Sequence, residues 1–248
     1  MPNKPFVFKQ FSVEQDRCAM KIGTDGILLG AWANLKDPYS ILDIGAGTGI
    51  IGLMMAQRSN AGLIDALEID EDAYEQCVDN FENSNWGDRL FCYHASLDEF
   101  AEEMQEEEKY DLIISNPPFH EPPLPVAFPP EEENLISNSR KIARFYDALP
   151  FEELAESASK LLSDEGEFAV ILPFSDEVNF LKIAKNYNLF PNRITRVRGM
   201  ENTPLKRSLL QLSFFEGKIL ESELTIEISR HQYTEEYTDL VKDFYLKM

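Results

Sequence analysis

Short apolar segments alternate with segments of helical spacing along this chain, and this alternation restricts the fold more than any other feature. Apolar runs occupy residues 41–44, 63–69, 90–93 and 110–115, and the first three each precede a helical pattern. The same order returns later, with a helix expected over 152–162, a strand over 167–172 and a helix over 176–187. Alternating strands and helices pack as a mostly parallel sheet covered on both faces. The sequence therefore predicts an α/β fold with a doubly wound, Rossmann-like sheet.

Two late strands break the parallel pattern. Residues 193–197 and 208–215 read as strands, and the turn-forming stretch 199–204 connects them. They are expected to form an antiparallel C-terminal hairpin at the side of the parallel sheet. A length of 248 residues suits one domain over 1–248, with residues 1–35 as an N-terminal extension packed on it.

Composition excludes several classes of protein. No apolar stretch approaches the roughly 20 residues that cross a bilayer, and residues 1–5 lack the apolar core of a secretory signal. The cysteines and histidines are scattered without metal-ligand spacing, at Cys18, Cys77, Cys92, His94, His120 and His231. We expect a cytoplasmic protein with no metal site and no membrane contact, and no obligate protein partner is evident.

The formal charge of −21 argues against a general nucleic-acid-binding surface. Much of the acid lies in two runs, at 102–108 and 131–133, which by default are solvated. Positive charge gathers at Arg140, Lys141 and Arg144, and these residues are candidates for contacts with RNA phosphates. A second basic group comprises Arg193, Arg196, Arg198, Lys206 and Arg207. Each group taken alone also fits ordinary protein surface.

The glycine-rich loop at 43–49 fits two cofactors. Gly45 and Gly47 suit a close backbone approach to S-adenosylmethionine (SAM), whereas the spacing of Gly47, Gly49 and Gly52 matches the dinucleotide fingerprint. Glu68, at the end of the next strand, suits the ribose hydroxyls of either. Asp43 favours SAM, because a carboxylate at the tip of the first strand would repel phosphates.

An asparagine and two prolines follow the strand at 110–115. The prolines stiffen the turn, and the Asn116 side-chain oxygen together with the Pro117 carbonyl can accept both hydrogens of a planar exocyclic amine. Phe119 offers a ring on which a base can stack. This turn predicts a holder for an amine that is to be alkylated, although Asn-Pro also ends strands with no such role.

Ser96 has two interpretations. It follows the strand at 90–93, where SAM-dependent enzymes commonly place an acid near the adenine amino group. The run from Ser96 to Glu99 also matches a helix capping box. We favour the cap, with Ser96 and Leu97 lining the adenine pocket through backbone and apolar contacts.

Several of these motifs occur together in one known family. Residues 8–11 and 16–32, the glycine loop, the turn at Asn116 and the tail at 237–246 resemble the bacterial tRNA(Val) adenine-N6 methyltransferases, which carry a class I methyltransferase sheet. The resemblance covers nearly the whole chain and implies SAM as cofactor and the adenine 3′ of the anticodon, in the anticodon stem-loop, as target. It also implies that Lys21, Thr24, Asp25 and Gly26 line the methionine end of SAM.

The chain departs from the pattern at Ser96 and at Phe119, where a tyrosine is more usual. The turn also resembles that of the guanine-N2 methyltransferases of ribosomal RNA, which lack the N-terminal stretch and rank second. The glutamine-N5 methyltransferases of release factors share the turn but carry a separate helical domain. Two further alternatives are a nicotinamide-dependent oxidoreductase and a SAM- and RNA-binding protein without catalysis.

Overall fold

A sheet of nine strands runs through the part of the chain that the computed structural model describes, which comprises residues 4–104, 109–118 and 149–247. Strands β3 to β7 are parallel, and β9 lies antiparallel between β7 and β8. The order across the sheet is β11 (Gln232–Tyr233), β10 (Leu220–Ser229), β8 (Phe190–Met200), β9 (Leu205–Ser213), β7 (Leu162–Pro173), β6 (Tyr110–Ser115), β3 (Ser40–Ile44), β4 (Leu63–Glu68) and β5 (Leu90–His94).

The sheet has a switch point between β3 and β6. From β3 the chain adds β4 and β5 on one side, and it then returns to add β6 and β7 on the other. The loops that follow β3 and β6 therefore start side by side, because Ile44 and Ser115, the last residues of these strands, are register partners. Ligands of doubly wound proteins bind at such a point, outside the carboxyl ends of the strands.

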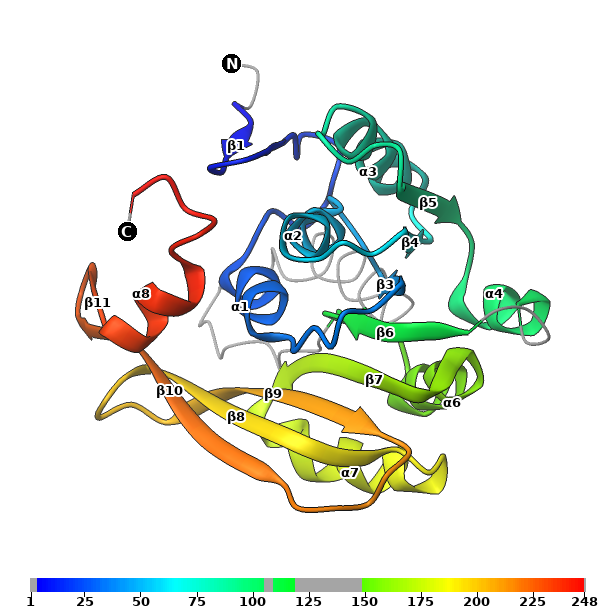
Figure 1. Cartoon of the computed structure of the whole chain (residues 1–248). Coiled ribbons are helices and arrows are strands. Elements are labelled where there is room, and N and C mark those ends of the chain that lie inside the picture. Colours follow the sequence, from blue (N-terminus) through cyan, green and yellow to red (C-terminus); the bar gives the residue numbers. More distant parts are fainter. Residues whose placement is uncertain (1–3, 105–108, 119–148, 248) are drawn as a thin grey trace, which may run out of the picture.

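Helices cover both faces of the sheet, as Figure 1 shows. One apolar cluster joins the sheet to α1 (Thr24–Trp32), α2 (Ile50–Arg58), α3 (Glu71–Glu82) and α8 (Glu235–Val241). The other joins it to α4 (Leu97–Glu103), α6 (Phe151–Leu161) and α7 (Glu177–Asn186), which follows the short 3-10 turn Phe174–Asp176. Both clusters form because successive side chains of a strand point to opposite faces of the sheet. In β7, Ala169 and Ile171 face the first cluster, whereas Phe168 and Val170 face the second.

The N-terminal segment shares the first of these clusters. Strands β1 (Phe6–Val7) and β2 (Ser12–Val13) form a small hairpin, and the buried side chains of Phe8, Phe11 and Val13 belong to that cluster. Phe8 also makes an isolated antiparallel bridge to Tyr245, which brings the two ends of the chain to one side of the molecule (Figure 1). A domain spanning 1–248 with an extension ending at residue 35 stays a prediction.

The predicted class of fold is confirmed, and so is the antiparallel hairpin of β8 and β9. The structure adds β10, which the sequence pattern did not predict and which lies parallel to β8. The loop expected between α6 and β7 is not found, because β7 begins at the residue that follows the last residue of α6. In the described ranges no helix has the length and apolar character needed to cross a membrane, and no three His, Cys, Asp or Glu side chains are grouped as metal ligands.

Candidate active site

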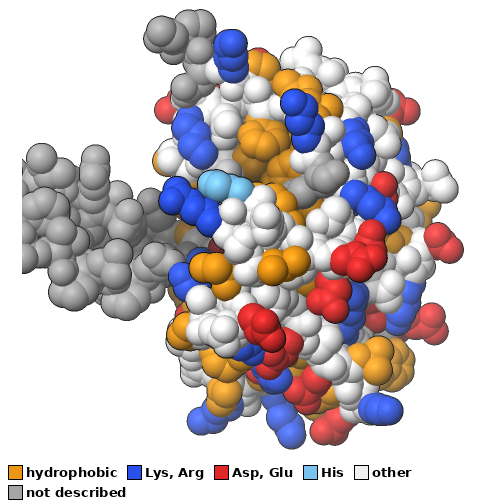
Figure 2. Space-filling view, turned by 90° about the vertical axis from the view of Figure 1, so that its left-hand side faces the viewer, with side chains coloured by type: hydrophobic (Ala, Val, Ile, Leu, Met, Phe, Trp, Pro, Cys, Tyr) orange, Lys and Arg blue, Asp and Glu red, His pale blue; other side chains and the backbone are white. Residues whose placement is uncertain are grey.

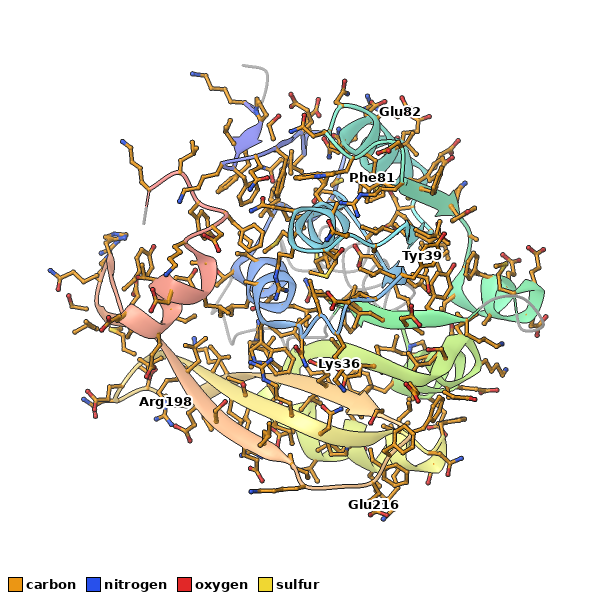
Figure 3. The ribbon with its side chains drawn as sticks, viewed as in Figure 1. Lys36, Tyr39, Phe81, Glu82, Arg198 and Glu216 are labelled. Atoms are coloured by element: carbon orange, nitrogen blue, oxygen red, sulfur yellow. The ribbon has the colours of Figure 1, made fainter. Side chains whose placement is uncertain are left out.

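The glycine loop after β3 leaves open space where a ligand would approach. Gly45, Gly47 and Gly49 have φ values of 74°, 54° and 77°, which side chains rarely adopt. A Cβ atom at Gly45 or Gly47 would meet no described atom within 4 Å, whereas one at Gly49 would lie 2.7 Å from the Phe81 ring. The first two glycines therefore face the ligand side. Gly49 faces α3, from which Phe81 points inward (Figure 3).

Glu68, the last residue of β4, binds the backbone of this loop. Its Oε2 atom accepts a 2.7 Å hydrogen bond from the Gly47 backbone N–H, and its Oε1 atom accepts from the N–H groups of Ile69 and Asp70, each at 2.9 Å. The carboxylate thus connects the ends of β3 and β4. Its position beside Gly47 places it next to the open side of the loop.

Asp43 lies beneath the loop and is fully buried. Its Oδ2 atom accepts a 3.1 Å hydrogen bond from the Gly52 N–H, in the first turn of α2, and its Oδ1 atom is buried without a partner among the described residues. Burial raises the pKa of Asp43 to about 7, with a smaller contribution from the charge of Glu68. Its role toward the cofactor stays a prediction, and the contact that the structure shows is with α2.

Ser96 is the N-cap residue of α4, as the capping interpretation predicts, but the capping box is not closed. The Ser96 hydroxyl donates a 2.9 Å hydrogen bond to the Glu99 carboxylate, and it makes no capping bond to the helix backbone. Leu97 is buried in the second apolar cluster. Both residues follow β5, so they stand two strands away from the glycine loop across the sheet.

Asn116 stands at the end of β6, on the other side of the switch point from the glycine loop. Its Oδ1 atom is buried and has no hydrogen-bond partner among the described residues. A buried amide oxygen without a donor is costly unless another molecule supplies one. Pro117 is buried beside it. The structure leaves an amide oxygen available at this position, and the role of Asn116 and Pro117 as an acceptor for an amine stays a prediction.

The N-terminal motif reaches this site through the first turn of α1. A Cβ atom on Gly26 would lie 3.8 Å from Asn116 Nδ2 and 3.6 Å from Ile50 Cγ2, so the Gly26 backbone lies close to the amide. Asp25 forms an ion pair with Arg207, with 2.8 Å between Oδ2 and Nε. Lys21 donates to the Gln15 carbonyl, and both Lys21 and Thr24 are exposed.

Four predicted site residues, Phe119, Arg140, Lys141 and Arg144, lie outside the described residues. In the second basic group, four guanidinium groups have protein partners. Arg196 binds Glu177 and Glu221, Arg198 binds Glu223, Arg207 binds Asp25, and Arg193 stacks on Trp32 at 4.3 Å. Their charges are largely balanced within the fold, so this group is a weaker candidate for RNA contact.

At the carboxyl edge of the sheet, Ile69 had not been singled out, and Arg207 had been noted only as a member of the second basic group. Ile69 is 68% exposed directly after Glu68, where an apolar side chain can cover a flat ring. Its position directly after Glu68, at the end of the second predicted strand, was the sequence signal that could have identified Ile69. Arg207 reaches Asp25 from β9, and no sequence spacing relates residues so distant in the chain.

Comparison with known proteins supports the fold. The crystal structure of a predicted O-methyltransferase from Agrobacterium tumefaciens superposes with a TM-score of 0.65, at 18% identity, covering 89% of this chain and 96% of that one. Residues 22–128 match the family model described as the methyltransferase small domain. Fold and site together define a class I methyltransferase that uses SAM as methyl donor.

Full-length relatives identify the family. A protein of Christiangramia forsetii is 62% identical over 100% of both chains, and one of Flavobacterium johnsoniae is 58% identical over 98% of this chain and 100% of its own. Both are named tRNA1(Val) (adenine(37)-N6)-methyltransferase. The chain belongs to this family. The oxidoreductase interpretation of the glycine spacing is thereby excluded.

Proposed function

We propose that this protein methylates the exocyclic N6 of adenine 37 in tRNA1(Val), the reaction that its relatives' names state. The observation that carries the proposal is the buried Oδ1 atom of Asn116 at the switch point of the sheet, which has no hydrogen-bond partner among the described residues. An amide oxygen in that position accepts a hydrogen bond from an N–H group. It therefore suits an amine substrate.

The residues around the glycine loop fit SAM. Gly45 and Gly47 leave room for its central part, and the Glu68 carboxylate stands beside Gly47 where ribose hydroxyls can donate to it. Ile69 can cover one face of the adenine, with Ser96 and Leu97 further along the same edge. Lys21, Thr24, Asp25 and Gly26 would surround the methionine end. SAM supplies an electrophilic methyl group on its sulfonium.

Asn116 and Pro117 would prepare the nucleophile. The adenine amine is a poor nucleophile because its lone pair is delocalised into the ring. Acceptors at Asn116 Oδ1 and the Pro117 carbonyl would hold both hydrogens and favour a more pyramidal nitrogen. Fixing the amine in near-attack geometry can contribute on the order of 7–11 kcal/mol. As the amine nitrogen bonds to the methyl carbon in place of the SAM sulfur, which keeps the electron pair of the broken bond, one amine proton leaves to solvent. Stacking on Phe119 would hold the extruded base.

One face of the molecule is suited to the RNA. Figure 2 shows Lys and Arg side chains gathering on the upper half of the face that carries the two chain ends, with hydrophobic side chains between them. We call this the terminal face and define it as the surface of residues 4–9 and 230–247, which meet at the bridge between Phe8 and Tyr245. The basic residues and the histidine of these two segments are Lys4, Lys9, Arg230, His231, Lys242 and Lys247. Tyr233 is exposed within it, and Phe6 and Tyr245, both partly exposed, lie edge to face there. Positive charge interleaved with aromatic rings is typical of surfaces that bind nucleic acid.

The proposal is tested with RNA from cells that lack the enzyme. Purified protein is incubated with labelled SAM and, separately, with tRNA1(Val), the same tRNA with adenine 37 changed to guanine, and ribosomal RNA. We expect N6-methyladenosine from the first alone. N2-methylguanosine from ribosomal RNA would instead support the guanine alternative, and binding of SAM and tRNA without any methylated nucleoside would show a non-catalytic protein.

A further inference from the structure

Ile69 carries an exposed side chain on a backbone that is hydrogen-bonded on both sides. The side chain is 68% exposed, so packing against the protein does little to determine where it lies. The N–H groups of Ile69 and Asp70 both donate to Glu68 Oε1 at 2.9 Å. The Ile69 carbonyl is 3.0 Å from Nε2 of the His94 ring. The backbone contacts with Glu68 and His94 therefore set the position of the Ile69 side chain.

His94 holds the peptide group that links Ile69 to Asp70. A carbonyl oxygen only accepts hydrogen bonds, so His94 carries a hydrogen on Nε2 and donates it. The N–H of the same peptide group belongs to Asp70 and donates to Glu68. Glu68 and His94 are register partners at the ends of β4 and β5. Rotation of this peptide group would break at least one of its two hydrogen bonds.

The His94 ring is held in turn by α3, which lies beside β5 (Figure 1). It stacks on the Tyr74 ring, with 5.2 Å between the ring centroids and 20° between the planes. The Tyr74 N–H donates a 2.8 Å hydrogen bond to the carbonyl of Asp70, the N-cap residue of α3. Because Asp70 directly follows Ile69, the imidazole and the peptide group that it binds belong to one closed ring of contacts.

We propose that His94 is a positioning residue for the adenine end of SAM. Its hydrogen bond to the Ile69 carbonyl fixes the backbone that presents the Ile69 side chain to the adenine ring. The inference rests on the part of the proposed function that assigns Ile69 to the adenine of SAM. Since His94 acts on neither the methyl group nor the target base, its loss affects cofactor affinity and leaves the methyl-transfer step as it is.

Two substitutions separate the hydrogen bond from the ring stack. His94→Phe keeps an aromatic ring beside Tyr74 but has no donor, whereas His94→Gln loses the ring and keeps an N–H donor. Phe91→Ala is the matched control, because it removes another exposed ring from β5. Calorimetry on each full-length variant gives the dissociation constants for SAM and for methylthioadenosine, which has the adenosine of SAM without its amino acid. Melting temperature and the single-turnover rate at saturating SAM and tRNA complete the set.

We expect His94→Phe to raise the dissociation constant for SAM roughly 2- to 10-fold, the scale of one lost hydrogen bond. The constant for methylthioadenosine should rise by the same factor, because His94 acts at the adenosine end. The single-turnover rate at saturation should stay within about twofold. His94→Gln should recover most of the affinity, and Phe91→Ala should bind both ligands as the wild type does.

Hydrogen exchange of the Asp70 amide follows the held peptide group with no ligand present. It should become faster in His94→Phe, return toward the wild-type rate in His94→Gln and stay unchanged in Phe91→Ala. A wild type that methylated no RNA while His94→Phe weakened SAM binding would refute the proposed function and leave the role of His94 standing. Dissociation constants unchanged in His94→Phe would overturn that role, even with a lower melting temperature, as would a rise for SAM without one for methylthioadenosine.

Discussion

The Glu68 carboxylate and the Gly47 backbone N–H are joined by a 2.7 Å hydrogen bond that spans the ends of two neighbouring strands. The carboxylate therefore shapes the glycine loop as well as facing the proposed ribose site. Glu68→Ala should weaken SAM binding by about 1.5–3 kcal/mol, roughly 10- to 150-fold, as for a lost charged hydrogen bond. Isothermal calorimetry measures it, with circular dichroism as the check that the fold persists. An unchanged dissociation constant would remove Glu68 from the site.

Asn116→Ala separates chemistry from cofactor binding. Because the buried Oδ1 atom is assigned to the amine, its removal should reduce the single-turnover rate by on the order of 100-fold or more. The SAM dissociation constant should stay near that of the wild type. A collapse of SAM affinity would instead make Asn116 a cofactor or structural residue.

Two glycine substitutions test the open side of the loop. Gly45→Ala puts a methyl group into the space assigned to SAM and strains a residue with a φ of 74°, at a cost of about 1–2 kcal/mol. We expect weaker SAM binding and a lower melting temperature. Gly217→Ala is the matched control, because a Cβ atom there also meets nothing within 4 Å and its φ lies outside the left-handed region. Equal SAM affinity in the two variants would contradict the proposed cradle.

The raised pKa of Asp43 predicts a pH dependence of stability. An unfolded aspartate titrates near a pKa of about 3.9, whereas the folded value is about 7. Between these values the folded protein keeps a proton that the unfolded chain releases, so this residue makes the protein less stable as pH rises from about 4 to about 7, by at most about 1.4 kcal/mol per unit. Asp43→Asn should remove this contribution.

The measurement is the difference in melting temperature between Asp43→Asn and wild type, taken without SAM. It should grow from pH 4 to pH 7 and level off above that range, whatever other groups titrate in both proteins. A difference that is constant with pH would show that Asp43 is ionised throughout.

Salt dependence can locate the RNA contacts. Replacing Lys4, Arg230 and Lys247 with Gln removes three exposed charges of the terminal face. Each lost phosphate contact lowers the magnitude of the slope of log K against log salt by about 0.7–0.9, so three should flatten it by roughly two units. Filter binding of tRNA at several salt concentrations gives the slope. Lys182→Gln with Lys185→Gln, on α7, is the control and should change it little.

The same assay on the Arg140, Lys141 and Arg144 triple alanine variant tests the sequence-based prediction. Tight binding with an unaltered slope would assign these three residues to ordinary surface. SAM affinity should be unchanged in both triple variants, since neither set belongs to the proposed cofactor site.

The sequence pattern predicted β3, β4, β6 and β7 because their apolar runs are buried on both faces and end at recognisable loops. It did not predict β10, in which only Leu224 is buried and the exposed Glu221 and Glu223 pair with arginines of β8. Apolar and polar residues do alternate from Glu223 to Ser229, a strand signal that the prediction did not use, but the sequence does not show that the glutamates of β10 pair with arginines of β8. The same limit applies to the site. The prolines that follow Asn116 made it recognisable in the sequence. The contact of Arg207 with Asp25 was not recognisable, because it depends on the register of β9 against β7.

The bridge between Phe8 and Tyr245 has a consequence for synthesis of the protein. The Lys9 side chain and the Lys242 carbonyl that it binds are 233 positions apart. At translation rates of about 5–20 residues per second, roughly 10 to 50 s pass between the emergence of these two ends. During that interval Phe8 and Phe11 lack the tail against which Phe8 packs. The nascent chain therefore keeps part of an aromatic segment at its leading end uncovered until its tail has been made.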